Sequence, residues 1–150
     1  MKALNQVVAS IAPSATLAIT NTAAKLRAQG VKVCAFAAGE PDFNTPDCIK
    51  QACAEALAEN KTRYVAAAGL PELRQAICKK LEVENKIKYE PSQVIVANGG
   101  KPALAQVFQT LINPGDEVII PAPYWLSYPE MVRVAGGVPV FVETTVESNF

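Results

Sequence analysis

The stretch Val94–Pro102 (VIVANGGKP) decides how this chain folds, because it joins an apolar run to a glycine turn and then to a lysine and a proline. Val94–Ala97 has the composition of a buried strand. The paired glycines that follow permit a sharp turn and let a ligand approach the backbone closely. Asn98-Gly99 would by itself also suit a hairpin turn, so the residues after it must distinguish the two structures.

Those residues favour a helix. Pro102 suits the first helical turn, where its missing N–H costs nothing. Apolar side chains then recur with the spacing of one helical face, at Leu104, Val107, Phe108, Leu111 and Ile112. We therefore predict strand, turn and helix. The free amides of the helix start and the charge of Lys101 predict an anion site, most often for phosphate; a turn that is glycine-rich only for packing is the alternative.

Length and composition favour one soluble domain with a substantial core. The chain has 150 residues, of which 50% are hydrophobic, and a formal net charge of zero. This neutrality argues against a nucleic-acid partner. Because no apolar run reaches membrane-spanning length and Met1–Ala12 lacks a signal-peptide pattern, we expect a cytoplasmic protein without a membrane partner.

The chain contains no histidine, and its 4 cysteines form no Cys-x-x-Cys pair. Histidine-activated nucleophiles and histidine metal ligands are therefore excluded, and we expect no metal site. Cys53 shares a predicted helix face with Ile49 and Leu57, which favours a small buried apolar role over a metal or a disulfide. Chemistry must come from lysine, carboxylates, tyrosine, backbone groups or a cofactor.

The remaining elements follow from caps and periodicity. Ser14 or Thr16 would cap a helix that ends near Gln29, before Gly30. Two further helices are predicted to open at Thr45-Pro46 and at Pro71. The other predicted elements are a strand over 31–37, a strand over 117–121, a loop over 122–129, a helix from there to about 135, and a strand over 138–142. Alternation after Gln93 indicates parallel βαβ units. Two covering helices leave that sheet unfinished at Phe150, so we expect the N-terminal part of a larger protein.

Six separated motifs resemble those of class I aminotransferases, which are fold-type I enzymes that use pyridoxal 5′-phosphate. They are Gly39–Phe43, Tyr64 with Gly69 and Leu73-Arg74, Asn98–Lys101, Asn113–Asp116, Pro121–Trp125 and Ser127–Pro129. The resemblance is greatest to bacterial-type aspartate aminotransferases. It implies an α/β fold, the start of the large domain with its parallel-rich sheet and covering helices. Residues 1–45 would form an N-terminal arm and a helix contributing to the small domain, and residues 46–150 an incomplete large domain.

The resemblance also assigns residues to the cofactor. Gly99, Gly100 and Lys101 would hold the phosphate of pyridoxal phosphate. Trp125 would stack on the pyridine ring and border the substrate. Tyr64 would reach across a homodimer interface to the phosphate of the neighbouring subunit. Without the resemblance, Trp125 suits a core or interface anchor, and Tyr64 an ordinary loop position.

Substrate contacts follow from the same resemblance. Gly39 would bind the α-carboxylate through its backbone amide, and it can also serve as a turn glycine. Ser14, Thr16 and Lys101 would surround the distal carboxylate of a dicarboxylic amino acid, although a helix cap and a surface charge also explain them. Relatives that accept prephenate carry a basic residue at the position of Ala12. Aspartate and glutamate are therefore the expected substrates, together with their 2-oxo acids.

No catalytic residue is expected within this chain. The Schiff-base lysine, the acid at the pyridine nitrogen and the arginine for the α-carboxylate should lie beyond Phe150, because none of their motifs precedes it. Lys101 lies too close to the phosphate turn to be that lysine. We predict that the full-length protein converts L-aspartate and 2-oxoglutarate to oxaloacetate and L-glutamate, and that this chain alone is inactive. An aromatic, alanine or prephenate aminotransferase and a non-catalytic truncated product are the alternatives.

Overall fold

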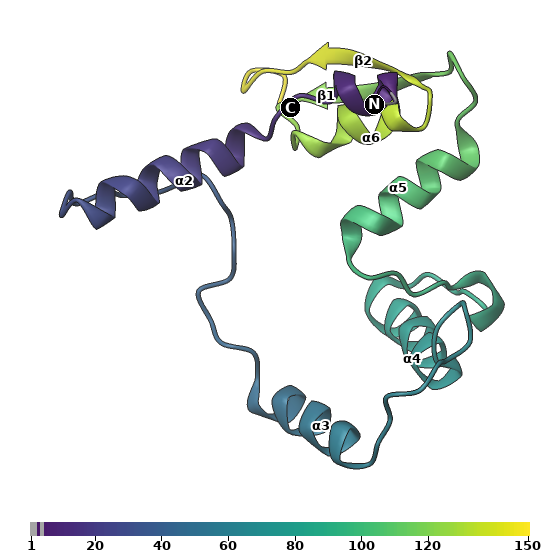
Figure 1. Cartoon of the computed structure of the whole chain (residues 1–150). Helices are drawn as coiled ribbons and strands as arrows, with labels where there is room; N and C mark the ends of the chain where they lie inside the picture. The colour runs from purple at the N-terminus through teal and green to yellow at the C-terminus, as the bar shows by residue number, and fades with distance from the viewer. Residues whose placement is uncertain (1–2, 4) are drawn as a thin grey trace. The chain divides into compact units, whose positions relative to one another are not determined.

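The computed structural model describes residues 3 and 5–150. These divide into two compact units, one formed by the residues up to Ala38 with Asn98–Phe150 and the other by Gly39–Ala97, and each is described by itself. The elements are α1 (Gln6–Ser10), α2 (Ala15–Ala28), α3 (Asp47–Ala58), α4 (Pro71–Lys80), the π-helical turn η1 (Leu81–Asn85), the 3₁₀ turn η2 (Pro91–Gln93), α5 (Gly100–Leu111), β1 (Glu117–Ala122), α6 (Ser127–Val134) and β2 (Val138–Glu143) (Figure 1). No helix of the described residues is both long and apolar enough to cross a membrane.

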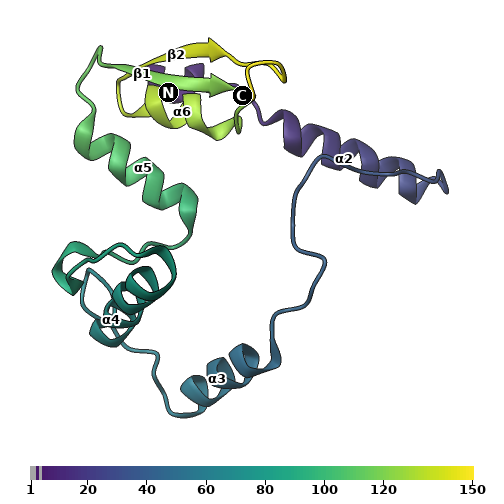
Figure 2. The ribbon, with the colours of Figure 1, turned by 180° about the vertical axis from the view of Figure 1, so that it is seen from behind.

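The predicted βαβ unit is present in the first unit. β1 and β2 pair in parallel over six residue pairs, from Glu117 opposite Val138 to Ala122 opposite Glu143. The connecting helix α6 packs on both strands and lies on one face of the pair in Figures 1 and 2. It begins at Ser127, within the segment predicted as loop. The parallel α/β fold expected from the alternating pattern is therefore confirmed for this part of the chain.

The start of β2 is held closely against neighbouring elements. A Cβ atom at Gly137 would lie 2.8 Å from Ile112 Cγ2 and 3.0 Å from Val132 Cγ1, so only glycine fits without displacement. The Gly137 N–H donates to the Val132 carbonyl at 2.9 Å, and the Val138 N–H to the Asp116 carbonyl at 2.8 Å. These contacts fix where the parallel ladder begins.

Side-chain caps begin two helices of the first unit, α1 and α2. Ser14, rather than Thr16, caps α2, because its Oγ accepts a hydrogen bond from the Leu17 N–H at 3.3 Å. Gly30 follows the helix end with a φ of 81°, a conformation that favours glycine. α5 covers almost the whole predicted range. The sequence did not predict α1, where Asn5 Oδ1 accepts from the Val7 N–H at 2.9 Å.

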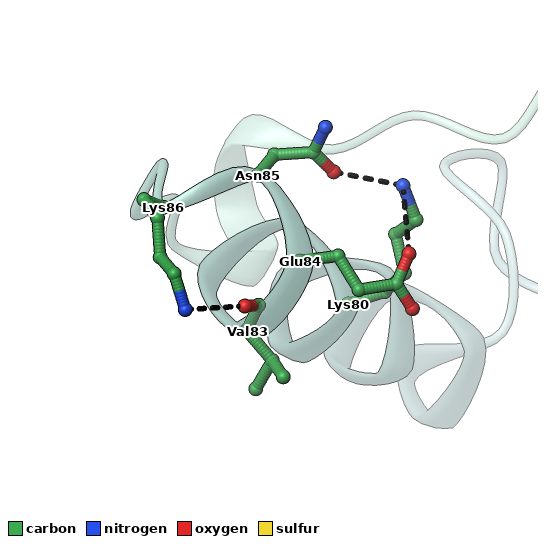
Figure 3. Close-up of polar contacts among 5 residues, drawn as sticks. All are labelled: Lys80, Val83, Glu84, Asn85 and Lys86. Atoms are coloured by element: carbon green, nitrogen blue, oxygen red, sulfur yellow. Dashed lines mark hydrogen bonds and ion pairs between the residues drawn. The ribbon is translucent and has the colours of Figure 1, made fainter.

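In the second unit, α4 begins at the predicted Pro71, and α3 begins at Asp47, directly after the predicted Pro46. Figure 3 shows how the chain leaves α4 through η1. Lys80 Nζ lies 2.7 Å from Asn85 Oδ1 and 3.3 Å from Glu84 Oε2. Lys86 then adopts a left-handed conformation with a φ of 59°, and its Nζ donates to the carbonyl of the preceding turn at 2.8 Å. The side chains of η1 thus close the helical segment.

Two predicted strands are not formed in the described residues. The segments 31–37 and 94–97 contain no strand, so both predictions are wrong. Val94 is extended, with φ −114° and ψ 128°, and the Val96 N–H donates to the Ala68 carbonyl at 3.0 Å. A single bond is not a ladder. An apolar run predicts an extended backbone, but pairing needs a neighbouring strand that local sequence does not specify.

Burial is limited. Among the described residues, the buried hydrophobic side chains are Ala23, Cys78, Ile120 and Val132. The apolar face predicted for α3 is exposed, with Ile49 56% and Leu57 61% accessible. Cys53 on that face is exposed as well, so the prediction that it is buried is wrong. Periodicity placed these residues on one face correctly, but the described part of the second unit does not cover that face.

Val132 provides a test of this packing. Its side chain is fully buried, whereas Val134 on the same helix is 44% exposed. We expect Val132→Ala to lower the free energy of unfolding by about 2 kcal/mol, since it leaves a cavity beneath the strand pair. Val134→Ala is the matched control and should change it by less than about 0.5 kcal/mol. Urea titrations followed by circular dichroism measure both, and equal losses would contradict the packing of α6.

Candidate functional site

The turn before α5 has an open side. Gly99 has a φ of 98°, a backbone conformation that strains any residue with a side chain. Added Cβ atoms at Gly99 and Gly100 would meet no atom within 4 Å. The two glycines are therefore not required by close packing against the described residues. One is required by backbone conformation, and both leave space above the turn for a ligand.

The charge at the start of α5 is unusual for a helix. Its first turn contains no acidic residue and carries Lys101, so a cation lies at the positive end of the helix dipole. The N–H groups of Gly100 and Lys101 have no acceptor within the helix, as helix geometry dictates. A bound anion resolves both features, because it neutralises the lysine and accepts from the free amides. The turn fits a phosphate group on this ground.

Lys101 contacts the aromatic loop after β1. Its Nζ lies 4.7 Å from the centroid of the Trp125 ring, a cation–π arrangement. Trp125 is 44% exposed. Its ring also meets Tyr128 edge-on, with centroids 5.5 Å apart and an interplanar angle of 87°. The structure thus brings Lys101 of the glycine turn and the single tryptophan of the chain together.

A cavity of about 660 Å³ opens beside this contact. Lys101 and Ser14 both line it, so two of the three predicted carboxylate ligands face one space. Thr16 is half-buried on the first turn of α2 and does not line the cavity. Apolar walls come from residues such as Leu126 and Phe141. This mixture suits a small organic acid, with a cation and a hydroxyl at one end and apolar surface at the other.

Gly39 and Tyr64 belong to the second unit and are described within it. A Cβ at Gly39 would meet nothing within 4 Å. The Tyr64 side chain is fully exposed on its loop. Neither Gly39 at its Cα nor the Tyr64 side chain is therefore packed against other residues of its own unit. Their predicted contacts with substrate and with a neighbouring subunit stay predictions.

Sequence reasoning missed several polar residues of the cavity. Gln109 lies two turns along α5 from Lys101, and the helical spacing could have revealed it. Glu130 and Arg133 form an ion pair one turn apart on α6, and both line the cavity. Glu130 Oε2 is buried and, among the described residues, has no hydrogen-bond partner. The charged residues that line the cavity therefore include this ion pair as well as Lys101.

Two exposed charged groups have pKa values that hydrogen bonds shift from their usual range. Hydrogen bonding to Glu59 raises the pKa of Lys61, and the Thr145 side chain lowers the pKa of Glu147. Neither group is among the residues that line the cavity. No cluster of three or more metal-binding side chains occurs in the part of the chain that the structure describes.

Comparison with known proteins gives the same family as the motifs. The sequence model of the family described as aminotransferase class I and II matches residues 31–150. An aspartate/prephenate aminotransferase of Thermus thermophilus is 51% identical over 150 residues, which is all of this chain and 39% of that protein. An aspartate aminotransferase of Geobacillus stearothermophilus is 52% identical over 143 residues, 95% of this chain and 36% of that protein.

Solved structures agree. The aspartate aminotransferase of Thermus thermophilus, determined with maleate, matches with a TM-score of 0.93 and 51% identity over 99% of this chain and 39% of that structure. One from Thermotoga maritima matches with a TM-score of 0.90 and 36% identity, over 97% and 39% respectively. The chain thus spans about two fifths of the length of the relatives that it matches. Its sequence and its fold show that it belongs to the class I and II aminotransferase family.

Proposed function

We propose that the whole protein carrying this chain transfers the amino group of L-aspartate to 2-oxoglutarate, with pyridoxal phosphate as cofactor. The observation that supports this most directly is the glycine turn at the start of α5 with Lys101 over Trp125. Pyridoxal phosphate is the cofactor that membership of the family implies. When bound, it supplies an electron sink for the carbanion that develops at the substrate α-carbon.

In this proposal, the residues of this chain bind the cofactor and orient it. The amides of Gly100 and Lys101 donate to the phosphate, which the positive end of α5 also stabilises. Trp125 offers an exposed ring surface for stacking on the pyridine ring. Tyr64, exposed on its loop, donates to the phosphate of the partner subunit in a homodimer. The covalently bound lysine is contributed by chain beyond Phe150, and residues 1–45 and 46–150 belong to a small and a large domain.

Substrate recognition uses the cavity. Lys101 and Ser14, which share it, bind the distal carboxylate. Thr16 follows Ser14 on the first turn of α2 and is the third proposed contact, although it does not line the cavity. The Gly39 amide binds the α-carboxylate. Support comes from the relative that was solved with maleate, a four-carbon dicarboxylate like aspartate.

Prephenate is the second candidate substrate. The Thermus thermophilus relative carries aspartate/prephenate aminotransferase in its name, and the cavity has apolar walls at Leu126 and Phe141 that suit a ring. Ala12, which also lines the cavity, provides no cation for the additional carboxylate. We therefore place aspartate first.

Transamination by the whole protein is the direct test. We expect turnover of L-aspartate with 2-oxoglutarate, measured as oxaloacetate in a coupled assay. The 150-residue chain should give none, because it lacks the covalently bound lysine. If prephenate or an aromatic amino acid is turned over faster than aspartate, that compound and not aspartate is the preferred substrate. No turnover of any amino acid by the whole protein would contradict the enzyme proposal.

Gly99→Ala tests the phosphate turn. A side chain at a φ of 98° strains the turn, so pyridoxal phosphate should bind about tenfold more weakly. The matched control is Gly115→Ala, since Gly115 has a φ of 92°, also has open space at Cβ, and lies in a different turn. Quenching of Trp125 emission on titration measures both affinities. Equal loss in the two variants would show that the Gly99 turn is not the binding site.

Lys101→Ala in the whole protein tests the carboxylate contact. Loss of a charged hydrogen-bond partner should lower kcat/KM for aspartate about tenfold or more beyond any loss for alanine. Lys79→Ala removes an exposed lysine from α4 and is the control. Equal losses for aspartate and alanine would restrict Lys101 to the phosphate.

A further inference from the structure

Trp125 is held by two neighbours of different character. Lys101 places its Nζ 4.7 Å from the ring centroid, and Tyr128 places its ring edge-on at 5.5 Å. Lys101 is exposed and carries its charge on a flexible stem, so its contact with the ring is readily broken. The edge-on contact with Tyr128 has no such freedom.

Tyr128 is fixed by the start of α6. Its N–H donates to the Trp125 carbonyl at 3.0 Å, which sets the two residues one helical turn apart. The next residue, Pro129, is buried, and Tyr128 itself is half-buried. The hydrogen bond to the Trp125 carbonyl fixes the backbone from which the Tyr128 side chain projects. Tyr128 therefore meets the indole from an anchored position.

This difference matters because the proposed function gives Lys101 two tasks. If Lys101 leaves the indole to bind a substrate carboxylate, one of the two contacts of the ring is lost. Tyr128 then remains to define the orientation of the indole. A stacking platform needs such an orientation, since stacking depends on the angle and offset of the rings.

We propose that Tyr128 is the positioning residue for Trp125, and that its ring, rather than its hydroxyl, holds the indole in the orientation that receives the cofactor. The role toward the cofactor rests on the proposed function. The contact between the two rings does not, and it is measurable on the protein without cofactor.

The single tryptophan makes the test direct, because all tryptophan emission of this chain comes from Trp125. Tyr128→Leu should raise the acrylamide quenching constant of Trp125 about twofold. Tyr128→Phe retains the edge-on ring and should match the unmodified chain. Tyr89→Leu removes a tyrosine of the second unit and is the control for loss of an aromatic residue. Far-UV circular dichroism checks that the helices are retained.

A second measurement uses the ligand. Tyr128→Leu should bind pyridoxal phosphate about fivefold more weakly, whereas inorganic phosphate, followed by calorimetry, should bind unchanged because it uses the turn. An increase in quenching for Tyr128→Phe equal to that for Tyr128→Leu would overturn the role of the ring. Equal pyridoxal phosphate affinity in Tyr128→Leu and the unmodified chain would overturn the inference and leave the proposed function standing.

The reverse outcome is also distinguishable. If the whole protein carries out no transamination, the proposed function fails, while the acrylamide result still decides the contact between the two rings. If Tyr128→Leu loses its helices, time-resolved anisotropy of the unmodified chain decides instead. An indole that rotates as freely as in a short peptide would overturn the inference, and a restricted one supports it.

Discussion

The parallel pairing of β1 with β2 is the constraint on which the candidate site depends. Parallel strands require a crossover, so the chain must leave the end of β1, return through α6 and enter β2 beside the start of β1. Gly137 permits this re-entry because no side chain fits between Ile112 and Val132. The crossover places the loop with Trp125 at the carboxyl end of β1, where ligands of open α/β sheets bind.

The residues at the start of α5 are not those that would make the helix most stable. A lysine at the positive end of a helix is unfavourable, and the residue before α5 has a φ of 98° that only glycine adopts without strain. Such local conflicts are expected where function, rather than stability, selects the residues. In the structure, the Lys101 ammonium group makes a cation–π contact with the nearby Trp125 ring. A phosphate or a carboxylate would interact with Lys101 more strongly than the indole does. The proposed function therefore places its anionic ligands at this turn.

The cavity explains how one lysine can serve two ligands. Lys101 stands at the boundary between the turn and the space lined by Ser14. Tyr128 holds the indole from a helical position that does not depend on the lysine. Lys101 can therefore move toward a ligand while the Tyr128 ring stays in contact with the indole. The aromatic side chain is thus fixed while the charge can move, and the Glu130–Arg133 ion pair adds charged groups on the α6 side of the cavity.

The sequence by itself determined what depends on neighbouring residues. Helices α2, α3, α4 and α5 begin within two residues of the positions predicted from Ser14, Pro46, Pro71 and Pro102. The strands predicted at β1 and β2 are both formed. Motif order was sufficient to identify the family, because each motif is local. The unpaired segments 31–37 and 94–97, the exposed face of α3 and the meeting of Lys101 with Trp125 were decided only by tertiary structure. Pairing, burial and long-range contact each require a partner distant in sequence, and no local pattern specifies where that partner lies.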